Sequence, residues 1–273
     1  MLASDYFIQF SKRLSGHPKE EHNAIFKELL HFHKIHSNGY WSDIVLEDKV
    51  ILEIDKQLTL LNTQKPLQYI LGLAPFYNID IKVNEHTLIP RPETEELVHL
   101  ILEENKEDAL NVLDIGTGSG CIPVTLLKNR PQWSALGLDI DEKAIKIAQL
   151  NAKHLKISSR LTFKKVDVLK ENFELENISI LVSNPPYIDE SEKAMMSKTV
   201  LEFEPEKALF TLTEDPLIFY KRIASAMEFQ KYKRKAYFEI NPIYAEEIID
   251  IFKSFNPTLS KDMQQKNRFL SIS

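Results

Sequence analysis

The chain has 273 residues, which at about 150 residues per domain indicates roughly two domains. Its composition, 43% hydrophobic and 27% charged, is that of a folded globular protein and excludes disordered and fibrous classes. The net charge is −6, and no basic stripe of the kind that grips a nucleic-acid backbone is evident, so we expect no direct nucleic-acid binding.

The first segment, residues 1–73, is expected to form a small helical domain. Apolar residues recur there at helical spacing, over 25–32 and 50–61. The start of the chain has no apolar stretch of signal-peptide length, and no apolar run reaches the ~18 residues of a membrane helix. We therefore expect a cytoplasmic protein with no membrane partner. Residues 76–83 alternate with period two, as a strand or hairpin arm does, and we interpret 74–91 as the interdomain connection.

Residues 92–273 alternate between helix and strand. Pro92 opens the first helix, in a position where the first turn tolerates proline. Further helices are expected at 121–127, 142–154, 216–227 and 245–255. Strands are expected at 109–115, 135–140, 161–166, 178–182, 236–240, 258–263 and 269–272. This alternation indicates an α/β fold with a doubly wound, mostly parallel sheet, to which the last two strands add an antiparallel edge.

Cysteine and histidine usage argues against a metal site. Cys121 is the only cysteine, which excludes a cysteine-based zinc site or a disulfide framework within one chain. His31, His33 and His36 are close in sequence, but their spacing does not place all three on one helical face. We expect no bound metal.

A glycine-rich loop follows the first strand of the larger domain. Three of the seven glycines fall within it, and glycine permits tight turns and close approach of a ligand to the backbone. The loop consists of Gly116, Thr117, Gly118, Ser119 and Gly120. Asp139 ends the next expected strand, where a carboxylate can accept hydrogen bonds from a ribose diol. Together they predict a nucleoside site at the carboxyl ends of the strands.

The spacing within this loop favours S-adenosylmethionine over NAD. The glycines follow G-x-G-x-G rather than the dinucleotide pattern G-x-G-x-x-G, and no P-loop is present. Asp114, directly before the loop, would repel a pyrophosphate but suits a cationic ammonium or sulfonium group.

The segment Asn184-Pro185-Pro186-Tyr187 follows the expected strand 178–182. The prolines lack backbone donors, and the Asn184 side chain offers an acceptor oxygen. A planar NH₂ group can therefore donate to the Asn184 oxygen and to the Pro185 carbonyl. The Tyr187 side chain would line the site and pack against the flat substrate group. Such alignment aims the poorly nucleophilic nitrogen of an amide or aromatic amine at an incoming methyl group.

These motifs together resemble the HemK/PrmC family, which methylates a glutamine side chain of peptide chain release factors. The similarity spans about residues 66–270. Besides the two motifs above it includes segments 66–72, 76–77 and 88–98, and Glu204-Pro205 with Ala208-Leu209. Asn-Pro-Pro-Tyr alone is shared with adenine-N6 DNA methyltransferases, but its combination with Ile-Pro-Arg-Pro-Glu-Thr-Glu is specific.

The resemblance implies a Rossmann-like class I methyltransferase domain and a role for each matching residue. Gly116 to Gly120 would cradle the methionine part of S-adenosylmethionine, and Asp139 its ribose. The adenine would lie beside Asp167 and Val168, although the family often has an aromatic residue at the latter position. The glutamine amide would bind at Asn184 and Pro185, with Asn184 also against the cofactor. The acceptor pocket would be completed by Pro186, Tyr187, Arg91 and Pro92.

The resemblance also implies substrate and product. A methyl group would pass to the side-chain nitrogen N5 of the glutamine in the Gly-Gly-Gln loop, leaving S-adenosylhomocysteine. The N-terminal helical domain would dock the release factor, and we expect a monomer.

Three alternatives stay open. A paralogue acting on a glutamine of a ribosomal protein would use the same chemistry. An adenine-N6 methyltransferase is disfavoured by the acidic charge balance and by the absence of an inserted target-recognition domain. A binding module without activity would be expected to lose Asp139 or Asn184, and both are present.

Two stretches depart from the family pattern. The family commonly has Glu-x-Gly-x-x-Gln where this chain has Glu-Ile-Asn-Pro-Ile-Tyr at 239–244, and a glycine shortly before Arg268 where this chain has Gln-Lys-Asn at 265–267. Both are remote in sequence from the expected chemistry. We expect them to affect local packing more than the reaction.

Overall fold

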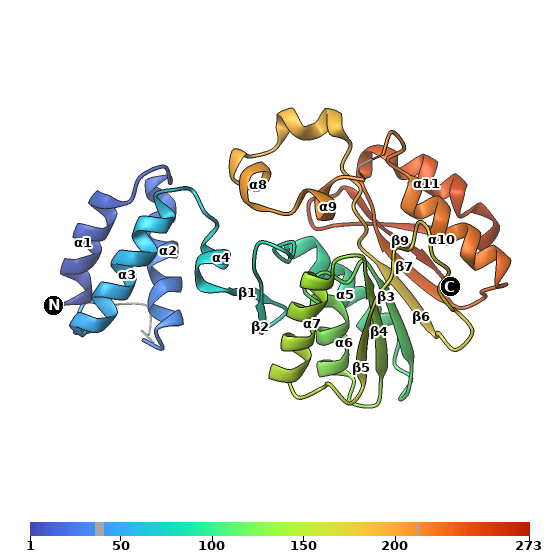
Figure 1. Cartoon of the computed structure of the whole chain (residues 1–273), viewed down its shortest axis with the longest axis horizontal. Coiled ribbons are helices and arrows are strands. Elements are labelled where there is room, and N and C mark those ends of the chain that lie inside the picture. Colours follow the sequence, from blue (N-terminus) through green and yellow to red (C-terminus); the bar gives the residue numbers. More distant parts are fainter. Residues whose placement is uncertain (36–40, 212) are drawn as a thin grey trace. The chain divides into compact units, whose positions relative to one another are not determined.

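The computed structural model describes residues 1–35, 41–211 and 213–273. The chain divides into two compact units, Met1–Gly72 and Leu73–Ser273, each of which is described by itself (Figure 1). Among the described residues, every helix is too short or too polar to cross a bilayer.

The first unit is helical. Its helices are α1 (Ala3–Arg13), α2 (Lys19–Phe32), α3 (Asp48–Leu61) and the short α4 (Leu67–Leu71). Most of the apolar positions expected over 25–32 and 50–61 belong to one core, in which Phe26 and Leu58 are buried together with Phe10 of α1. Phe32, at the end of α2, is exposed instead. Trp41 is partly buried and packs edge-on against Phe26, with ring centroids 5.4 Å apart, at the margin of this core. His36 lies outside the described residues.

The second unit begins with a hairpin of β1 (Leu73–Phe76) and β2 (Ile79–Lys82). Its two-residue turn, Tyr77-Asn78, has φ values of 46° and 63°, the left-handed pair that matches the twist of a hairpin. The period-two stretch at 76–83 therefore spans this turn rather than forming one strand. Asn151 fixes the hairpin to α7 (Glu142–His154), because its side chain accepts from Lys82 N (2.7 Å) and donates to Lys82 O (3.0 Å).

A seven-stranded sheet forms the centre of the second unit, in the order β5-β4-β3-β6-β7-β9-β8. The first five strands in this order are parallel, and the last two pairings are antiparallel. The strands are β3 (Asn111–Ile115), β4 (Ser134–Asp139), β5 (Leu161–Lys165), β6 (Ile180–Ser183), β7 (Lys235–Glu239), β8 (Thr258–Lys261) and β9 (Asn267–Ile272). The strand order reverses between β3 and β6, where open α/β sheets bind ligands.

Helices cover both faces of this sheet. Figure 1 shows α5 (Pro92–Glu104), α6 (Cys121–Asn129) and α7 together on one side, and α10 (Ile218–Phe229) and α11 (Ala245–Ile251) on the other. The doubly wound α/β architecture and the antiparallel edge expected from the sequence are confirmed. A 3-10 turn, η3 (Lys253–Phe255), replaces the end of the helix expected at 245–255, and a second, η2 (Pro242–Tyr244), precedes it.

One helical region was not predicted from the sequence. Between β6 and α10 the chain forms a 3-10 segment η1 (Glu190–Met195), α8 (Lys198–Phe203) and α9 (Glu206–Leu209). No residue of η1 or α8 is buried, and each element has only six residues, so neither is long enough to show the repeating apolar stripe on which recognition of a helix depends. Their helical form relies on capping instead, by Asp189 at η1 and Ser197 at α8.

Candidate active site

The glycine loop turns across the end of β4 through left-handed backbone. Gly116, Gly118 and Gly120 have φ values of 76°, 55° and 75°, and the backbone N–H groups of Gly116 and Thr117 both donate to Leu138 O (2.9 Å). A Cβ atom on Gly120 would lie 3.1 Å from Cβ of Ala148, whereas one on Gly118 would meet nothing within 4 Å. Gly120 therefore packs the loop against α7, while the loop's open side faces a cavity.

Asp139 holds the loop in this conformation. Its carboxylate accepts from Gly118 N through Oδ2 and from Asp141 N through Oδ1, each at 2.8 Å. A carboxylate has about four acceptor sites, so the remaining lone pairs can accept from hydroxyl groups of a ligand. Burial raises the pKa of Asp139, and the two backbone donors oppose that shift.

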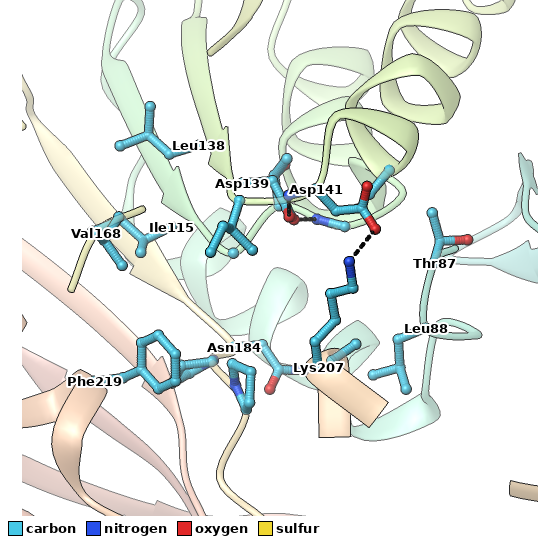
Figure 2. Close-up of a pocket in the computed structure, with 18 of the residues that line it drawn as sticks. Thr87, Leu88, Ile115, Leu138, Asp139, Asp141, Val168, Asn184, Lys207 and Phe219 are labelled. Atoms are coloured by element: carbon cyan, nitrogen blue, oxygen red, sulfur yellow. Dashed lines mark hydrogen bonds and ion pairs between the residues drawn. The ribbon is translucent and has the colours of Figure 1, made fainter. Parts of the chain in front are cut away.

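A cavity of about 370 Å³ lies beside this loop, within the size range of small-ligand sites (Figure 2). Eleven of the residues expected in the site line it: Arg91, Gly116, Thr117, Gly118, Ser119, Asp139, Asp167, Val168, Asn184, Pro185 and Pro186. Gly120, Pro92 and Tyr187 are not among the lining residues. Phe219 of α10, which the sequence analysis missed, lies toward the same end of the cavity as Val168.

Asp114, on β3 one residue before the strand ends, is fully buried. Among the described residues, neither of its carboxylate oxygens has a hydrogen-bond partner, and the nearby Thr117 hydroxyl has none either. Burial raises the pKa of Asp114 to about 7, and the negative charge of Asp139 adds to the rise. The Thr117 hydroxyl opposes it from close by, although it is not aligned for a hydrogen bond to either carboxyl oxygen. A cation bound close to this buried carboxyl group would stabilise its ionised form and lower its pKa.

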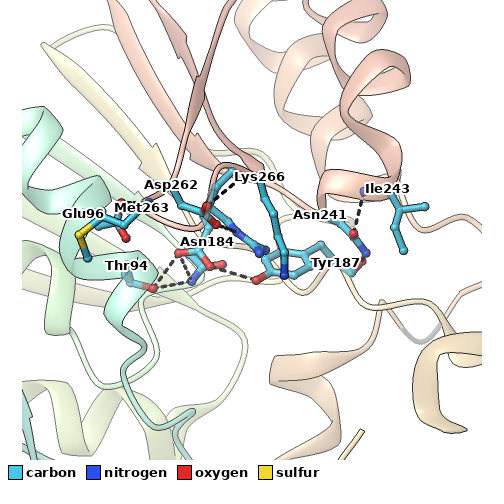
Figure 3. A network of polar contacts seen from close by, with 11 residues as sticks. Thr94, Glu96, Asn184, Tyr187, Asn241, Ile243, Asp262, Met263 and Lys266 are labelled. Carbon is cyan, nitrogen blue, oxygen red and sulfur yellow. Dashed lines mark hydrogen bonds and ion pairs between the residues drawn. The ribbon is translucent and has the colours of Figure 1, made fainter. Parts of the chain in front are cut away.

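The Asn184 side chain is held by a buried polar cluster (Figure 3). Its amide nitrogen Nδ2 donates to Glu239 Oε2 (2.9 Å) and to Thr94 Oγ1 (3.1 Å). Thr94 donates in turn to Glu239 Oε2 (2.7 Å), and the Tyr187 hydroxyl donates to Glu239 Oε1 (3.0 Å). Asn184 Oδ1 takes part in none of these hydrogen bonds. The cluster therefore orients the amide with its oxygen available as an acceptor.

Glu239 and Asn241 bring the 239–244 stretch, remote in sequence, next to the Asn-Pro-Pro-Tyr segment. The expectation that this stretch affects local packing more than the reaction stays a prediction. β7 ends at Glu239 beside β6, which leads into Asn184, so the two carboxyl ends meet. Asn241, at the family's glycine position, donates to Tyr187 O (3.2 Å) and to Glu192 Oε1 (2.9 Å). This stretch directly contacts the Asn-Pro-Pro-Tyr segment.

The second departure lies in a turn that favours glycine. Gln265 has a φ of 65°, in the left-handed region that L-residues with a side chain enter at a cost. The family's glycine in this region would meet that backbone requirement without strain.

A second cavity of about 260 Å³ shares Leu88, Arg91, Asn184, Pro185 and Ala208 with the first. Tyr187, Val200 and Met196 also line it, so the previously unpredicted 190–209 region supplies one of its walls. Arg91 donates to the buried Glu204 at 2.6 Å, and Glu204 also accepts from Ile89 N. These contacts join segment 88–98 to the later block around Glu204. Asn184 and Pro185 thus line both cavities.

Comparison with known proteins identifies the family. A family model described as methyltransferase small domain matches residues 94–212. The release factor glutamine methyltransferase of Flavobacterium psychrophilum is 37% identical, over 100% of this chain and 99% of its own length. The Streptococcus pneumoniae protein of the same name is 38% identical, over 100% and 98%. The chain belongs to the release factor glutamine methyltransferase family. The resemblance found in the sequence is confirmed.

Solved structures show the same fold in more distant proteins. The catalytic domain of hMettl16, solved with an RNA hairpin, is 16% identical and covers 82% of its own chain and 83% of this one, with a TM-score of 0.58. At this identity the likeness extends to the fold alone. The solved structure and this member of the release factor glutamine methyltransferase family therefore share the α/β fold.

The described residues contain no group of three or more His, Cys, Asp or Glu side chains that could hold a metal ion. His33 Nε2 contacts Gln57 Oε1 at 3.1 Å within the first unit. Cys121 lines the first cavity, and burial raises the pKa of its thiol to about 12, with the Asp114 charge adding to the shift. A thiol in this state is a poor nucleophile.

Proposed function

We propose that this protein transfers the methyl group of S-adenosylmethionine to the side-chain nitrogen N5 of the glutamine in the Gly-Gly-Gln loop of class I peptide chain release factors. The observation that carries the proposal is the Asn184 amide. Its nitrogen is engaged by Glu239 and Thr94, which leaves its oxygen as an acceptor beside the Pro185 carbonyl, where two cavities meet. The relatives that match over the whole chain carry the corresponding name.

The first cavity fits S-adenosylmethionine, which when bound supplies an electrophilic sulfonium methyl group. The glycine loop would hold the methionine part, and the free lone pairs of Asp139 would accept from the ribose hydroxyls. Asp167, Val168 and Phe219 would bound the adenine, with the Phe219 ring available where the family often has an aromatic residue at position 168. Asp114 matches a cationic ligand because its buried carboxyl group has no donor of its own among the described residues.

The acceptor amide would be bound by two hydrogen bonds. Asn184 Oδ1 and the Pro185 carbonyl accept the two N–H groups of the glutamine, which turns the nitrogen lone pair toward the methyl group. Pro186 and Tyr187 exclude water around it. Transfer would form a bond from the amide nitrogen to the methyl carbon as the sulfur–carbon bond breaks. The resulting cationic nitrogen would then lose one of its protons, which would reach solvent by way of the acceptor that holds it. Alignment of this kind contributes up to about 7–11 kcal/mol in well-oriented systems.

The remaining roles follow from these. Arg91, which lines both cavities, would form the entrance to the acceptor site, with the buried Glu204 fixing its guanidinium. Pro92 lines neither cavity and would act by starting α5 directly after Arg91. The helical unit Met1–Gly72 would dock the body of the release factor. We propose that the enzyme acts as a monomer in the cytoplasm and does not bind nucleic acid directly, in keeping with its net charge of −6.

Mass spectrometry of an intact release factor tests this function. Incubated with the protein and S-adenosylmethionine, the factor is expected to gain the mass of one methyl group, and Asn184→Ala is expected to abolish the gain. A ribosomal protein and an adenine-containing oligonucleotide serve as parallel substrates. Methylation of either one, with an unmodified release factor, would overturn the proposed substrate.

A further inference from the structure

We propose that Glu239 is a positioning residue for methyl transfer: its carboxylate selects the one orientation of the Asn184 amide that can accept from the substrate. This inference rests on the proposed function. It concerns what fixes the orientation of the Asn184 side-chain amide, because Asn184 can adopt two orientations and only one of them accepts from the substrate.

The two orientations of an asparagine amide are nearly identical in shape. Rotation by 180° about the last side-chain bond exchanges oxygen and nitrogen, so packing hardly distinguishes them. With the nitrogen toward the substrate, the site would present N–H donors to the N–H donors of the glutamine. Only the hydrogen-bond partner on the inner side of Asn184 can exclude this inactive form.

Glu239 is that partner, because an ionised carboxylate accepts hydrogen bonds and donates none. It faces Asn184 at 2.9 Å, so the atom of Asn184 that meets it must be the nitrogen. The flipped amide would set two oxygens against each other in a buried site, where Glu239 is 1% exposed, and such a contact is costly because neither oxygen could be solvated.

The surroundings hold Glu239 as a hydrogen-bond acceptor. Burial raises the pKa of its carboxyl group, and the hydrogen bonds from Thr94 and Tyr187 and the positive charge of Arg268 oppose that rise. Three donors converge on its two oxygens, from Thr94, Tyr187 and Asn184. The Tyr220 hydroxyl donates to the Glu239 backbone carbonyl (2.9 Å), which anchors the strand end itself. Hydrogen bonds to the charged form offset part of the desolvation of a buried carboxylate.

Thr94 provides a second acceptor for the Asn184 amide nitrogen. Its hydroxyl donates to Glu239 Oε2 (2.7 Å), so its oxygen is left to accept from Asn184 Nδ2 (3.1 Å). The amide nitrogen of Asn184 thus has an acceptor for each of its two hydrogens. Both acceptors depend on Glu239, because Glu239 sets the direction of the Thr94 hydroxyl.

The substitution Glu239→Gln is the first test, since it preserves shape and replaces one oxygen by a donor. The introduced amide can keep accepting from Tyr187 through its oxygen and donate to Asn184 through its nitrogen, so that Asn184 turns its own oxygen inward. We expect kcat to fall at least 100-fold, with KM for the release factor and Kd for S-adenosylmethionine each within threefold of wild type. Thermal unfolding of the variant verifies that it is folded.

The double variant Asn184→Asp with Glu239→Gln separates positioning from general damage. A carboxylate at position 184 has acceptors on both sides, so it can accept from the amide introduced at position 239 and still accept from the substrate. We expect it to be at least tenfold more active than Glu239→Gln alone. A residue with a merely structural role would not be rescued by a second change at the catalytic asparagine.

Glu104→Gln is the matched control. Glu104 also accepts from a tyrosine hydroxyl, Tyr237 (2.9 Å), but lies outside both cavities, and its variant should retain wild-type activity. Activity of Glu239→Gln within threefold of wild type, or no rescue in the double variant, would overturn the inference while the function stands. A wild-type protein that leaves the release factor unmodified would overturn both.

Discussion

The two halves of the proposed active site, one for the cofactor and one for the methyl acceptor, are built in different ways. The cofactor half consists mainly of local structure, since the glycine loop takes its shape from its own backbone angles and from Asp139 on the next strand. The acceptor half depends on side chains far apart in the chain, with Thr94, Asn184 and Glu239 meeting from α5, the end of β6 and β7. Changes in the first half should therefore alter cofactor affinity, and changes in the second should alter the rate of methyl transfer.

The largest effect is expected for Asn184→Ala. The variant removes one of two acceptors for the glutamine amide, and loss of an oriented polar group at a reacting centre typically costs 100- to 1,000-fold; we expect about 1,000-fold in kcat. Cofactor affinity should change less than tenfold, although Asn184 lines that cavity. Single-turnover methylation at saturating cofactor measures the rate. A rate within tenfold of wild type would remove Asn184 from the chemistry.

Asp139→Ala should show the opposite pattern. It removes the hydrogen bonds to the ribose and the support of Gly118, so we expect cofactor Kd to rise about 100-fold, in line with ~1.5–3 kcal/mol per hydrogen bond to a charged group. At saturating cofactor, kcat should remain within about threefold. Calorimetric titration gives Kd, and Glu142→Gln, an exposed acid nearby, is the control. An unchanged Kd would contradict the assignment.

Asp114 provides a prediction about pH. Its folded-state pKa is about 7, against about 3.9 in the unfolded chain. Between these values the folded protein binds more protons than the unfolded chain, so stability falls as pH rises from about 4 to about 7. The loss is on the order of 4 kcal/mol for the ligand-free protein.

Asp114→Asn should remove that pH dependence. Chemical unfolding at pH 5, 6, 7 and 8 is expected to show a shallower decline for the variant than for wild type. The variant should also bind S-adenosylmethionine more weakly, because the buried negative charge is lost. Parallel pH curves for the two proteins would contradict the raised pKa of Asp114.

The smallest effect is expected for Gln265→Gly, outside both halves. Relief of the left-handed backbone at φ 65° should stabilise the protein by about 1 kcal/mol, with unchanged activity. Asn256→Gly is the matched control: its φ is 52°, but asparagine tolerates this region, so its gain should be smaller. Equal or unfavourable effects at the two positions would argue against strain at Gln265.

Features that depend on a short stretch of sequence, such as single helices, strands and the glycine loop, can be predicted from the sequence. Helix α7 was placed at its observed ends, and the strands of the sheet to within a few residues, because each carries its own periodicity and flanking turns. The glycine loop and Asp139 were found for the same reason. Segment 190–209 shows no helix in the sequence because its helical elements are only four to six residues long, too short for an apolar periodicity to be recognised.

What the sequence could not provide are contacts between distant residues. Glu239 shows no local sign of its role, and only the adjacency of β6 and β7 brings it to Asn184. A strand order taken from the family resemblance would place β6 next to β7, and so would predict that Glu239 lies close to Asn184. Phe219 likewise reaches the cofactor cavity only because α10 packs beside it.

The number and position of the transferred methyl groups test the account most directly. In the proposed site both hydrogens of the glutamine amide are donors, to Asn184 and Pro185, so the first methylation would remove one of the two anchors. Fragmentation mass spectrometry of a release factor after prolonged incubation with excess S-adenosylmethionine should therefore show a single methyl group on N5 of the Gly-Gly-Gln glutamine. A dimethylated glutamine, or a methyl group on another residue, would contradict the two-acceptor site.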